Sequence, residues 1–324
     1  MKIICLFFVF LAFSVNILNA IPILRVFLPS QNPIEKAGFI LAQKKKLYAE
    51  KNLNVNFIEA NQEDPLTALD YGLADIVQES LPIALAKGAK NPAYTLYAQL
   101  YQMPTTTIAC IKPGVEDLQQ LAGKNIGYSS PKDLLNTQIW FAYTGFNMEG
   151  ANPLYKFERF DNLGEAFSRG KLSCGVMERH QVPLVTAKTT SQFSFFSPTF
   201  EQGGVLSEGL YINETSLQSP DFKSNLELFL KISEAGWRYC FEHKEEFYMQ
   251  ILDQKFKDII PLEVALRTLS LIEENFDFKA QIPFGLVSKT KINYTVINML
   301  KTQNYSQLSD YPKNSFFLNE LISN

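Results

Sequence analysis

The sequence predicts an α/β protein built on largely parallel sheets, and three observations support this prediction. Strand-like and helix-like hydrophobic patterns alternate through the first two thirds of the 324 residues, as βα units require. The last third is helical and has no strands of its own, so it must pack on the preceding sheets. With 46% hydrophobic and 19% charged residues, the chain can bury a large core. Its length suits about two domains but no linker separates them, so we expect two lobes with the chain crossing between them.

The first hundred residues show the alternation most clearly. Residues 21–28 form an apolar run closed by Pro29, and residues 53–60 alternate apolar and polar positions with period two, so both predict strands. Between them, Pro33 stands at the first turn of a predicted helix. The following elements are expected to be helix 64–71, strand 74–78, helix 80–87 and strand 93–100.

The alternation continues to about residue 212. Strands are expected over 105–111, at the end of 114–128, and over 155–160, 172–177, 193–196 and 203–212. Helices are expected over 132–143, 161–171 and 178–188. The C-terminal third then shows helical spacing of apolar residues over 220–243, 244–254, 261–276 and 291–302.

The first 20 residues are typical of a secretory signal peptide. Lys2 is their only charged residue, the apolar run from Ile3 to Val15 is short for a membrane span, and the small Ala20 marks the cleavage site. An uncleaved anchor is the alternative. No later run of 18 apolar residues occurs, so we expect an exported, soluble, periplasmic protein.

The charge balance argues against a nucleic-acid partner. Removing Lys2 from the 30 basic residues leaves 29 against 33 acidic ones, a net charge of −4 for the mature chain. Phosphate backbones are bound by a surplus of basic side chains, which this chain lacks.

Three cysteines remain in the mature chain, at Cys110, Cys174 and Cys240. Their separation does not match the paired spacing of a zinc site. We expect buried free thiols, and one disulfide is the alternative.

The chain lacks the common catalytic signatures. The GxSxG, P-loop, GxGxxG and HExxH patterns do not occur, and the two histidines are His180 and His243. A nucleophile–base pair of Cys174 and His180 is conceivable, but their spacing has no motif value. We therefore expect neither an enzyme nor a bound cofactor or metal.

Ligand-binding residues are sought where strands lead into helices. In open α/β sheets, ligands bind beyond the carboxyl ends of the strands, where polar groups and helix N-termini gather. Each of these polar side chains has the alternative role of capping its helix. The candidates are Ser30, Gln31 and Asn32 after the first strand, Gln78, Glu79 and Ser80 after the third, Ser129 and Ser130 before helix 132–143, Glu178 and His180 after strand 172–177, and Gln102 at a crossover.

Several blocks, in the expected order, resemble the family of exported solute-binding proteins for nitrate, sulfonates, taurine and thiamine pyrimidine precursors. These blocks are NPIEKAGFILAQKKKLYAEKNLNVNFIEA (32–60), DPLTALDYGLADIVQESLPIALAKGAK (64–90), LAGKNIGYSS (121–130), DNLGEAFSRGKLSCGVMER (161–179) and a helix with Gly236–Trp237 (213–247). The pyrimidine-synthesising enzymes of the family use a histidine where this chain has Lys36, and their cysteine-rich motif is absent. Lys36 joins the candidate ligand-binding residues, and the enzymatic activity is not expected.

The resemblance implies a type 2 periplasmic-binding-protein fold, with two α/β lobes, a ligand cleft between them and a helical C-terminal part. Lobe one would comprise residues 22–108 plus 201–324, and lobe two residues 109–200. The implied function is that of a monomeric substrate-binding protein, which delivers a small molecule to the permease of an ABC importer. An extracytoplasmic ligand sensor for a membrane signalling protein is the alternative.

The ligand implied by the family is either pyrimidine- or thiamine-precursor-like, or sulfonate- or nitrate-like. Glu79 and Glu178 would repel a small anion if both face the cleft, so an amine or ring nitrogen fits them better. Arg179, Lys36 or His180 are the candidates to neutralise these two carboxylates.

Overall fold

The computed structural model describes residues 23–58, 64–88, 94–146, 154–278 and 282–302. The predicted signal peptide, residues 1–20, lies outside them. Among the described residues, none of the helices combines the length and hydrophobicity that crossing a bilayer requires.

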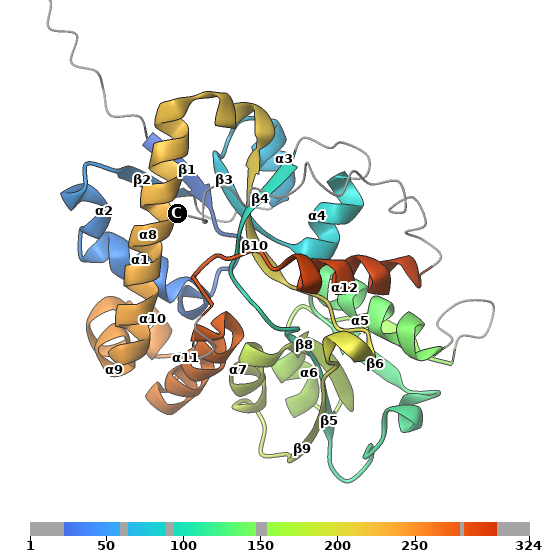
Figure 1. Ribbon diagram of the computed structural model, residues 1–324. Coiled ribbons are helices and arrows are strands. Elements are labelled where there is room, and N and C mark those ends of the chain that lie inside the picture. The colour runs from blue at the N-terminus through green and yellow to red at the C-terminus, as the bar shows by residue number, and fades with distance from the viewer. Residues whose placement is uncertain (1–22, 59–63, 89–93, 147–153, 279–281, 303–324) are drawn as a thin grey trace, which may run out of the picture.

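Two five-stranded sheets form the framework (Figure 1). The first has the strand order β2-β1-β3-β10-β4 and the second the order β7-β6-β8-β5-β9. The bounds of the first sheet's strands are β1 Ile23–Phe27, β2 Asn54–Ile58, β3 Ile76–Ser80, β4 Tyr94–Gln99 and β10 Glu208–Asn213. Those of the second sheet are β5 Thr106–Ile111, β6 Asn125–Tyr128, β7 Lys156–Arg159, β8 Cys174–Glu178 and β9 Phe193–Phe196. We call each sheet with its helices a lobe, the first and the second.

Both sheets are largely parallel, as predicted, but each contains one antiparallel strand. In the first lobe β10 runs against both β3 and β4, and in the second lobe β5 runs against both β8 and β9. These two strands are the ones that follow a crossing of the chain from one lobe to the other, over residues 100–105 and 197–207. The crossovers lie beside each other, since Pro104 and Leu206 form an antiparallel bridge.

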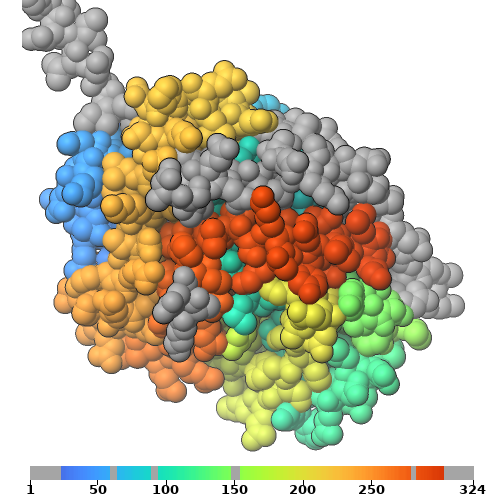
Figure 2. Space-filling model, in the orientation of Figure 1, coloured from blue at the N-terminus to red at the C-terminus, as the bar shows by residue number. Residues whose placement is uncertain are grey.

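Helices cover both faces of each sheet. In the first lobe these helices are α1 Ala37–Lys44, α2 Leu47–Glu50, α3 Pro65–Asp70, α4 Leu81–Gly88, α8 Pro220–Glu242, α9 Lys244–Glu246, α10 Gln254–Lys257 and α11 Leu262–Phe276. In the second lobe they are α5 Pro131–Thr144, α6 Leu163–Ser168 and α7 Val182–Thr186. Helix α12, Lys289–Leu300, packs on both α4 and α5 and so lies across the junction of the lobes, where Figure 2 shows it on the surface.

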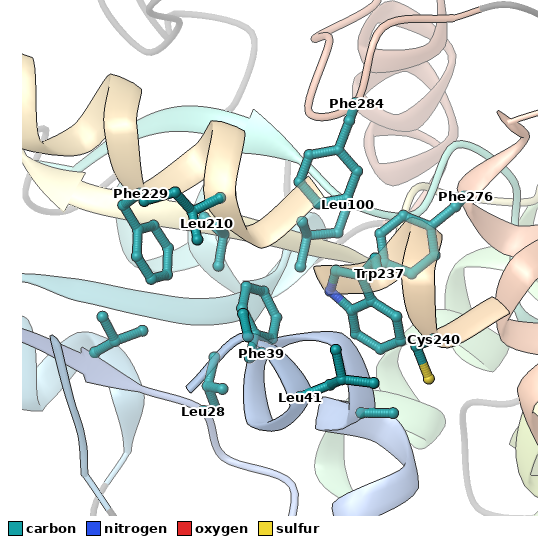
Figure 3. Packing of buried hydrophobic residues seen from close by; sticks show 14 of the residues in the cluster. Leu28, Phe39, Leu41, Leu100, Leu210, Phe229, Trp237, Cys240, Phe276 and Phe284 are labelled. Atoms are coloured by element: carbon teal, nitrogen blue, oxygen red, sulfur yellow. The ribbon is translucent and has the colours of Figure 1, made fainter. Parts of the chain in front are cut away.

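The core of the first lobe follows from strand alternation. Successive side chains of a strand point to opposite faces, so Val26 joins the cluster beneath α1 and α8, whereas Phe27 joins the cluster beneath α3 and α4. Beneath α8, Phe39 stacks on Phe229 with ring centroids 6.0 Å apart and meets the edge of Trp237 at 5.7 Å (Figure 3). The second lobe repeats this arrangement, with α5 on one face of its sheet and α6 on the other.

Cys110 and Cys174 form a disulfide in the second lobe. They are directly opposite each other on the antiparallel strands β5 and β8, and their Cα atoms are 4.1 Å apart. The expectation of free thiols is therefore wrong for this pair, because it took no account of the strand register. It is confirmed for Cys240, which is free and buried in α8.

A single carboxylate, Glu178 at the end of β8, joins the two crossovers to the second lobe. Thr105 of the first crossover donates a hydrogen bond to Glu178 Oε1 at 2.9 Å, and Ser207 of the second donates to the same oxygen at 2.8 Å. Lys132 of α5 donates to Oε2 at 3.0 Å. Glu178 is 2% exposed, and its bonds to the two crossover hydroxyls form away from solvent.

The charges around Glu178 keep it ionised. Burial alone would raise its pKa, but the nearby charges of Lys132 and His180 outweigh burial and lower the pKa below the ordinary value. The carboxylate therefore contributes to stability above its ordinary pKa of 4.5, and that contribution is lost as the pH falls through the lower folded-state pKa.

The disulfide predicts a specific thiol count. Unfolded without reductant, the mature chain should take up one alkylating group, at Cys240, and with reductant it should take up three. Intact mass spectrometry gives the count, and Cys240→Ala should show none without reductant. Three groups on the unreduced chain would contradict the bond between Cys110 and Cys174.

The role of Glu178 predicts a loss of stability in Glu178→Gln. The amide leaves Lys132 with one carboxylate fewer and is a weaker acceptor for both crossover hydroxyls, so urea unfolding at neutral pH should show a loss of about 1–3 kcal/mol. Glu165→Gln is the matched control, because Glu165 forms an exposed pair with Arg169 and should change stability by less than about 0.5 kcal/mol. The loss should shrink as the pH falls below 4.5, the ordinary carboxyl pKa, toward the lower folded-state pKa of Glu178. Equal effects of the two substitutions would contradict the assignment.

Candidate functional site

A cavity of about 390 Å³ lies between the two lobes. Its lining contains side chains from the carboxyl ends of β1, β3, β6 and β8, which is where an open α/β sheet places a ligand. The lining residues are Pro29, Ser30, Glu35, Asp64, Pro65, Gln78, Glu79, Ile83, Tyr101 and Glu208 on the first-lobe side, and Ser129, Ser130, Pro131, Lys132, Asp133, Glu178, His180 and Gln181 on the second-lobe side.

The structure brings seven of the twelve predicted residues together at this cavity. They are Ser30, Gln78, Glu79, Ser129, Ser130, Glu178 and His180. Gln78 and Glu79 lie in the last part of β3, Glu178 ends β8, and the other four follow a strand, so the pattern that selected them, a strand leading into a helix, is the feature that places them at the cavity.

The other five predicted residues do not line the cavity. Asn32 accepts the Ile34 amide and caps the turn Pro33–Lys36, while the Gln102 amide donates to the carbonyls of Gln99 and Leu286 and so fixes the first crossover. Ser80 is fully buried behind Glu79. Gln31 is exposed and Lys36 is half-buried, both outside the lining.

Lys132 is the central cation of the site, and it connects the lobes. Its Nζ donates to Glu178 Oε2 in the second lobe and to Glu208 Oε1 in the first. Gln78 donates to the other oxygen of Glu208 at 3.0 Å. Burial would lower the pKa of Lys132, but Glu178 and Glu208 raise it well above the ordinary value, so the ammonium stays charged.

His180 forms a second connection between the lobes. Its Nε2 lies 3.6 Å from Glu35 Oε1 and 3.6 Å from Glu178 Oε2, and its ring meets Tyr101 edge-on at 5.6 Å. Burial would lower the pKa of His180, but the two carboxylates raise it. In turn, burial would raise the pKa of Glu35, but His180 lowers it to about 2. The two carboxylates thus favour the protonated form of His180.

Two carboxyl groups at the cavity have raised pKa values. Burial, together with the negative charge of Glu208, raises the pKa of Glu79 to about 8. Burial raises the pKa of Asp133 to about 6. Asp133 shares a reciprocal capping arrangement with Ser130, whose hydroxyl accepts from the Asp133 amide at 3.1 Å and donates to its carboxylate at 2.7 Å.

Several lining residues were missed by the sequence analysis. Lys132 and Asp133 lie just after the selected Ser129–Ser130 loop, with only Pro131 between, so extending that loop by one helical turn finds them. Glu35 stands in the first turn after β1. The positions of Glu208 and Tyr101 at the cavity depend on the path of the two crossovers. Local sequence patterns do not show that path.

One of the expected neutralising residues is confirmed for Glu178 and one is not. His180 lies 3.6 Å from Glu178 Oε2 and lowers the pKa of Glu178. Arg179 instead pairs with Glu274 at 2.6 Å, away from the cavity lining, and Lys132, which was not expected, also contacts Glu178. The conceivable pair of Cys174 and His180 is also excluded, because the sulfur of Cys174 is bonded to Cys110.

Comparisons with known proteins agree with this architecture. The sequence matches the family model described as NMT1/THI5 like over residues 34–247, more than half of the chain. A search of curated proteins finds no significant match.

Solved structures of the same fold are numerous. A putative periplasmic sulfonate-binding protein from Methylobacillus flagellatus superposes with a TM-score of 0.65 at 11% identity, covering 93% of this chain and 92% of that one. A conserved Candida albicans gene product with the generic periplasmic-binding-protein fold gives 0.63 at 16% identity, covering 92% and 96%. The alkanesulfonate-binding protein from Xanthomonas axonopodis pv. citri, bound to MOPS, gives 0.62 at 13% identity, covering 88% and 93%. The chain therefore has the type 2 periplasmic-binding-protein fold and belongs to the NMT1/THI5-like family.

Proposed function

We propose that the chain is the exported substrate-binding component of an ABC importer, which captures one small molecule between its lobes and delivers it to a membrane permease. The cavity between the lobes is the observation that supports this proposal. Its volume of about 390 Å³ suits a small organic molecule, and its lining mixes apolar surfaces with convergent polar groups.

The proposed mechanism is closure of two rigid bodies on the ligand. The expected bodies are residues 22–108 plus 201–324 and residues 109–200, and we propose the crossovers over 100–105 and 197–207 as the hinges, so that all of β5, from Thr106, moves with the second body. Contacts between these bodies include the ion pairs of Lys132 with Glu208 and of Arg179 with Glu274. A ligand that contacts both linings stabilises the closed arrangement by its greater affinity for that state.

Export is supported by two features of different kinds. The first 20 residues have the pattern of a signal peptide. The disulfide between Cys110 and Cys174 belongs to chains that fold in an oxidising compartment. We therefore propose a periplasmic location and a monomer that meets its permease at the membrane.

Binding without turnover is proposed because both members of the conceivable nucleophile–base pair, Cys174 and His180, are engaged by other groups. His180 is buried between two carboxylates, and Cys174 is held in the disulfide. The ligand classes considered are pyrimidine- or thiamine-precursor-like compounds and sulfonate- or nitrate-like anions. The second class is suggested by the names of the structural neighbours from Methylobacillus and Xanthomonas.

A thermal-shift screen of the mature chain, residues 21–324, tests the proposal. The panel contains aminopyrimidines, thiamine, taurine, alkyl sulfonates and nitrate, and the chain is first unfolded and refolded to remove any carried ligand. A ligand at 100 times its Kd should stabilise the folded state by about 2.7 kcal/mol and raise Tm by about 2 °C or more.

The matched controls are two tryptophan variants. Ile83→Trp fills the cavity and should abolish the shift, whereas Ile297→Trp, on the exposed face of α12, should preserve it. A shift that survives in Ile83→Trp would place the ligand elsewhere. The absence of a shift with every compound, including the charge series described below, would contradict the proposed function.

A further inference from the structure

The cavity lining is strongly unbalanced in charge. Two cationic groups, Lys132 and His180, stand among six carboxyl groups, which belong to Glu35, Asp64, Glu79, Asp133, Glu178 and Glu208. Both cations already contact carboxylates of the protein: Lys132 contacts Glu178 and Glu208, and His180 contacts Glu35 and Glu178. An incoming anion would therefore have to displace an internal carboxylate from its partner.

The N-terminus of α5, a natural position for an anion, is also occupied. Ser130 caps the helix, and the carboxylate of Asp133 accepts the hydroxyl hydrogen of Ser130 at 2.7 Å. A ligand anion at this end of the helix would meet Asp133, which lies within the lining. The positive end of the α5 dipole, which would attract an anion, is thus offset by the carboxylate of Asp133.

Glu79 differs from the other five carboxyl groups in its partners. Each of the other five contacts a cationic or hydroxyl-bearing side chain. Glu79 Oε1 accepts the backbone amide of Ser80 at 2.7 Å, and Oε2 accepts no hydrogen bond from any residue that the structure describes. Glu79 is 8% exposed and lines the cavity, so this oxygen without a hydrogen-bond partner belongs to a buried side chain of the cavity lining.

We propose that the cavity binds a small organic cation and that the Glu79 carboxylate is the direct partner of its positive charge. This inference rests on the proposed function. The cationic group would donate to Oε2, the acceptor that the protein leaves without a partner. The apolar surfaces of Pro29, Ile83 and Tyr101 would then contact the ligand's carbon atoms.

An organic cation fits the site better than a metal ion. The cavity, at about 390 Å³, is far larger than a bare ion, and part of its lining is apolar. Within the described residues, no group of three or more His, Cys, Asp or Glu side chains is arranged to hold a metal. Metal ions of the hard class need several oxygen ligands at once, whereas an ammonium or amidinium group needs a few acceptors.

Proton release accompanies binding of a cation at this position. The charged and titratable groups that act on Glu79 are Glu208 of β10, Asp64 at the start of α3 and Lys132 of α5. Burial and the two carboxylates raise its pKa, while Lys132 lowers it, and the resulting value of about 8 leaves Glu79 protonated near neutral pH. A cation favours the ionised carboxylate, so binding releases the proton to solvent. Affinity should therefore rise with pH by up to about tenfold per unit and level off above about pH 8.

The test uses sets of compounds that share a shape and differ in charge. Benzamidine, benzamide and benzenesulfonate form one set, and alkylamines, alkyl alcohols and alkyl sulfonates of equal chain length form a second. Calorimetry of the refolded mature chain should show that a cation of at least one set binds at least tenfold more tightly than its neutral and anionic counterparts. In two buffers of different ionisation enthalpy, at about pH 6.5, about one proton should be released per cation bound.

Glu79→Gln keeps the shape and removes the charge. This variant should bind the cation at least tenfold more weakly, with no proton release, while Glu165→Gln on the exposed face of α6 should bind it as the unaltered chain does. Urea unfolding separates binding from folding, because Glu79→Gln should be at least as stable as the unaltered chain at pH 8, where the buried carboxylate begins to ionise.

The outcomes distinguish this inference from the proposed function. Preferred binding of a sulfonate or a neutral compound would overturn the cation inference and preserve the binding function. Unchanged cation affinity in Glu79→Gln, or binding of none of the cations while another compound binds, would also overturn it. If no compound binds the refolded chain at all, both fail.

Discussion

The arrangement of the whole molecule depends on one contact between the lobes, the bridge from Glu178 through Lys132 to Glu208. Glu178 holds Thr105 and Ser207, one from each crossover, and Lys132 extends the contact to the first lobe. Without this bridge, the two crossovers would have no shared anchor in the second lobe. The same groups line the cavity, so the interaction that joins the lobes also sets the chemistry of the space between them.

The bridge explains why acidic groups dominate the cavity. One ammonium group shared by Glu178 and Glu208 leaves this part of the lining negative, and Glu79 nearby responds with a raised pKa. Buried carboxyl groups are stable only when they are paired or protonated, and the site contains carboxyl groups of both kinds. Glu35 is paired with His180 and ionised, whereas Glu79 has no cationic contact and is protonated near neutral pH. This arrangement differs from what an anion-binding cavity requires, although two of the structural neighbours are named as sulfonate-binding proteins.

Local patterns predicted much of the fold and part of the site. The strand ends that carry Ser30, Gln78, Glu79, Ser129, Ser130 and Glu178 follow from hydrophobic runs that close at a polar residue, and those residues line the cavity. Glu208 was not identified, and a disulfide was only the alternative expectation with no pairing assigned, because both the position of Glu208 and the Cys110–Cys174 bond depend on antiparallel strands that enter after a crossover. Strand alternation shows which residues face a core, but it does not reveal which strand lies beside which. Lys132 lies in the first turn of α5, just past the serine cap, where a lysine is ordinarily a solvated surface residue and so carries no local signal of a buried partner.

The most direct test of this account is a crystal structure of the refolded mature chain with the tightest ligand from the binding experiments. The account predicts the ligand in the cavity between the lobes, with a positively charged nitrogen within hydrogen-bond distance of Glu79 Oε2 and the bridge from Glu178 to Glu208 intact. A ligand bound outside this cavity, or an anionic group seated on Lys132 in place of Glu208, would contradict it.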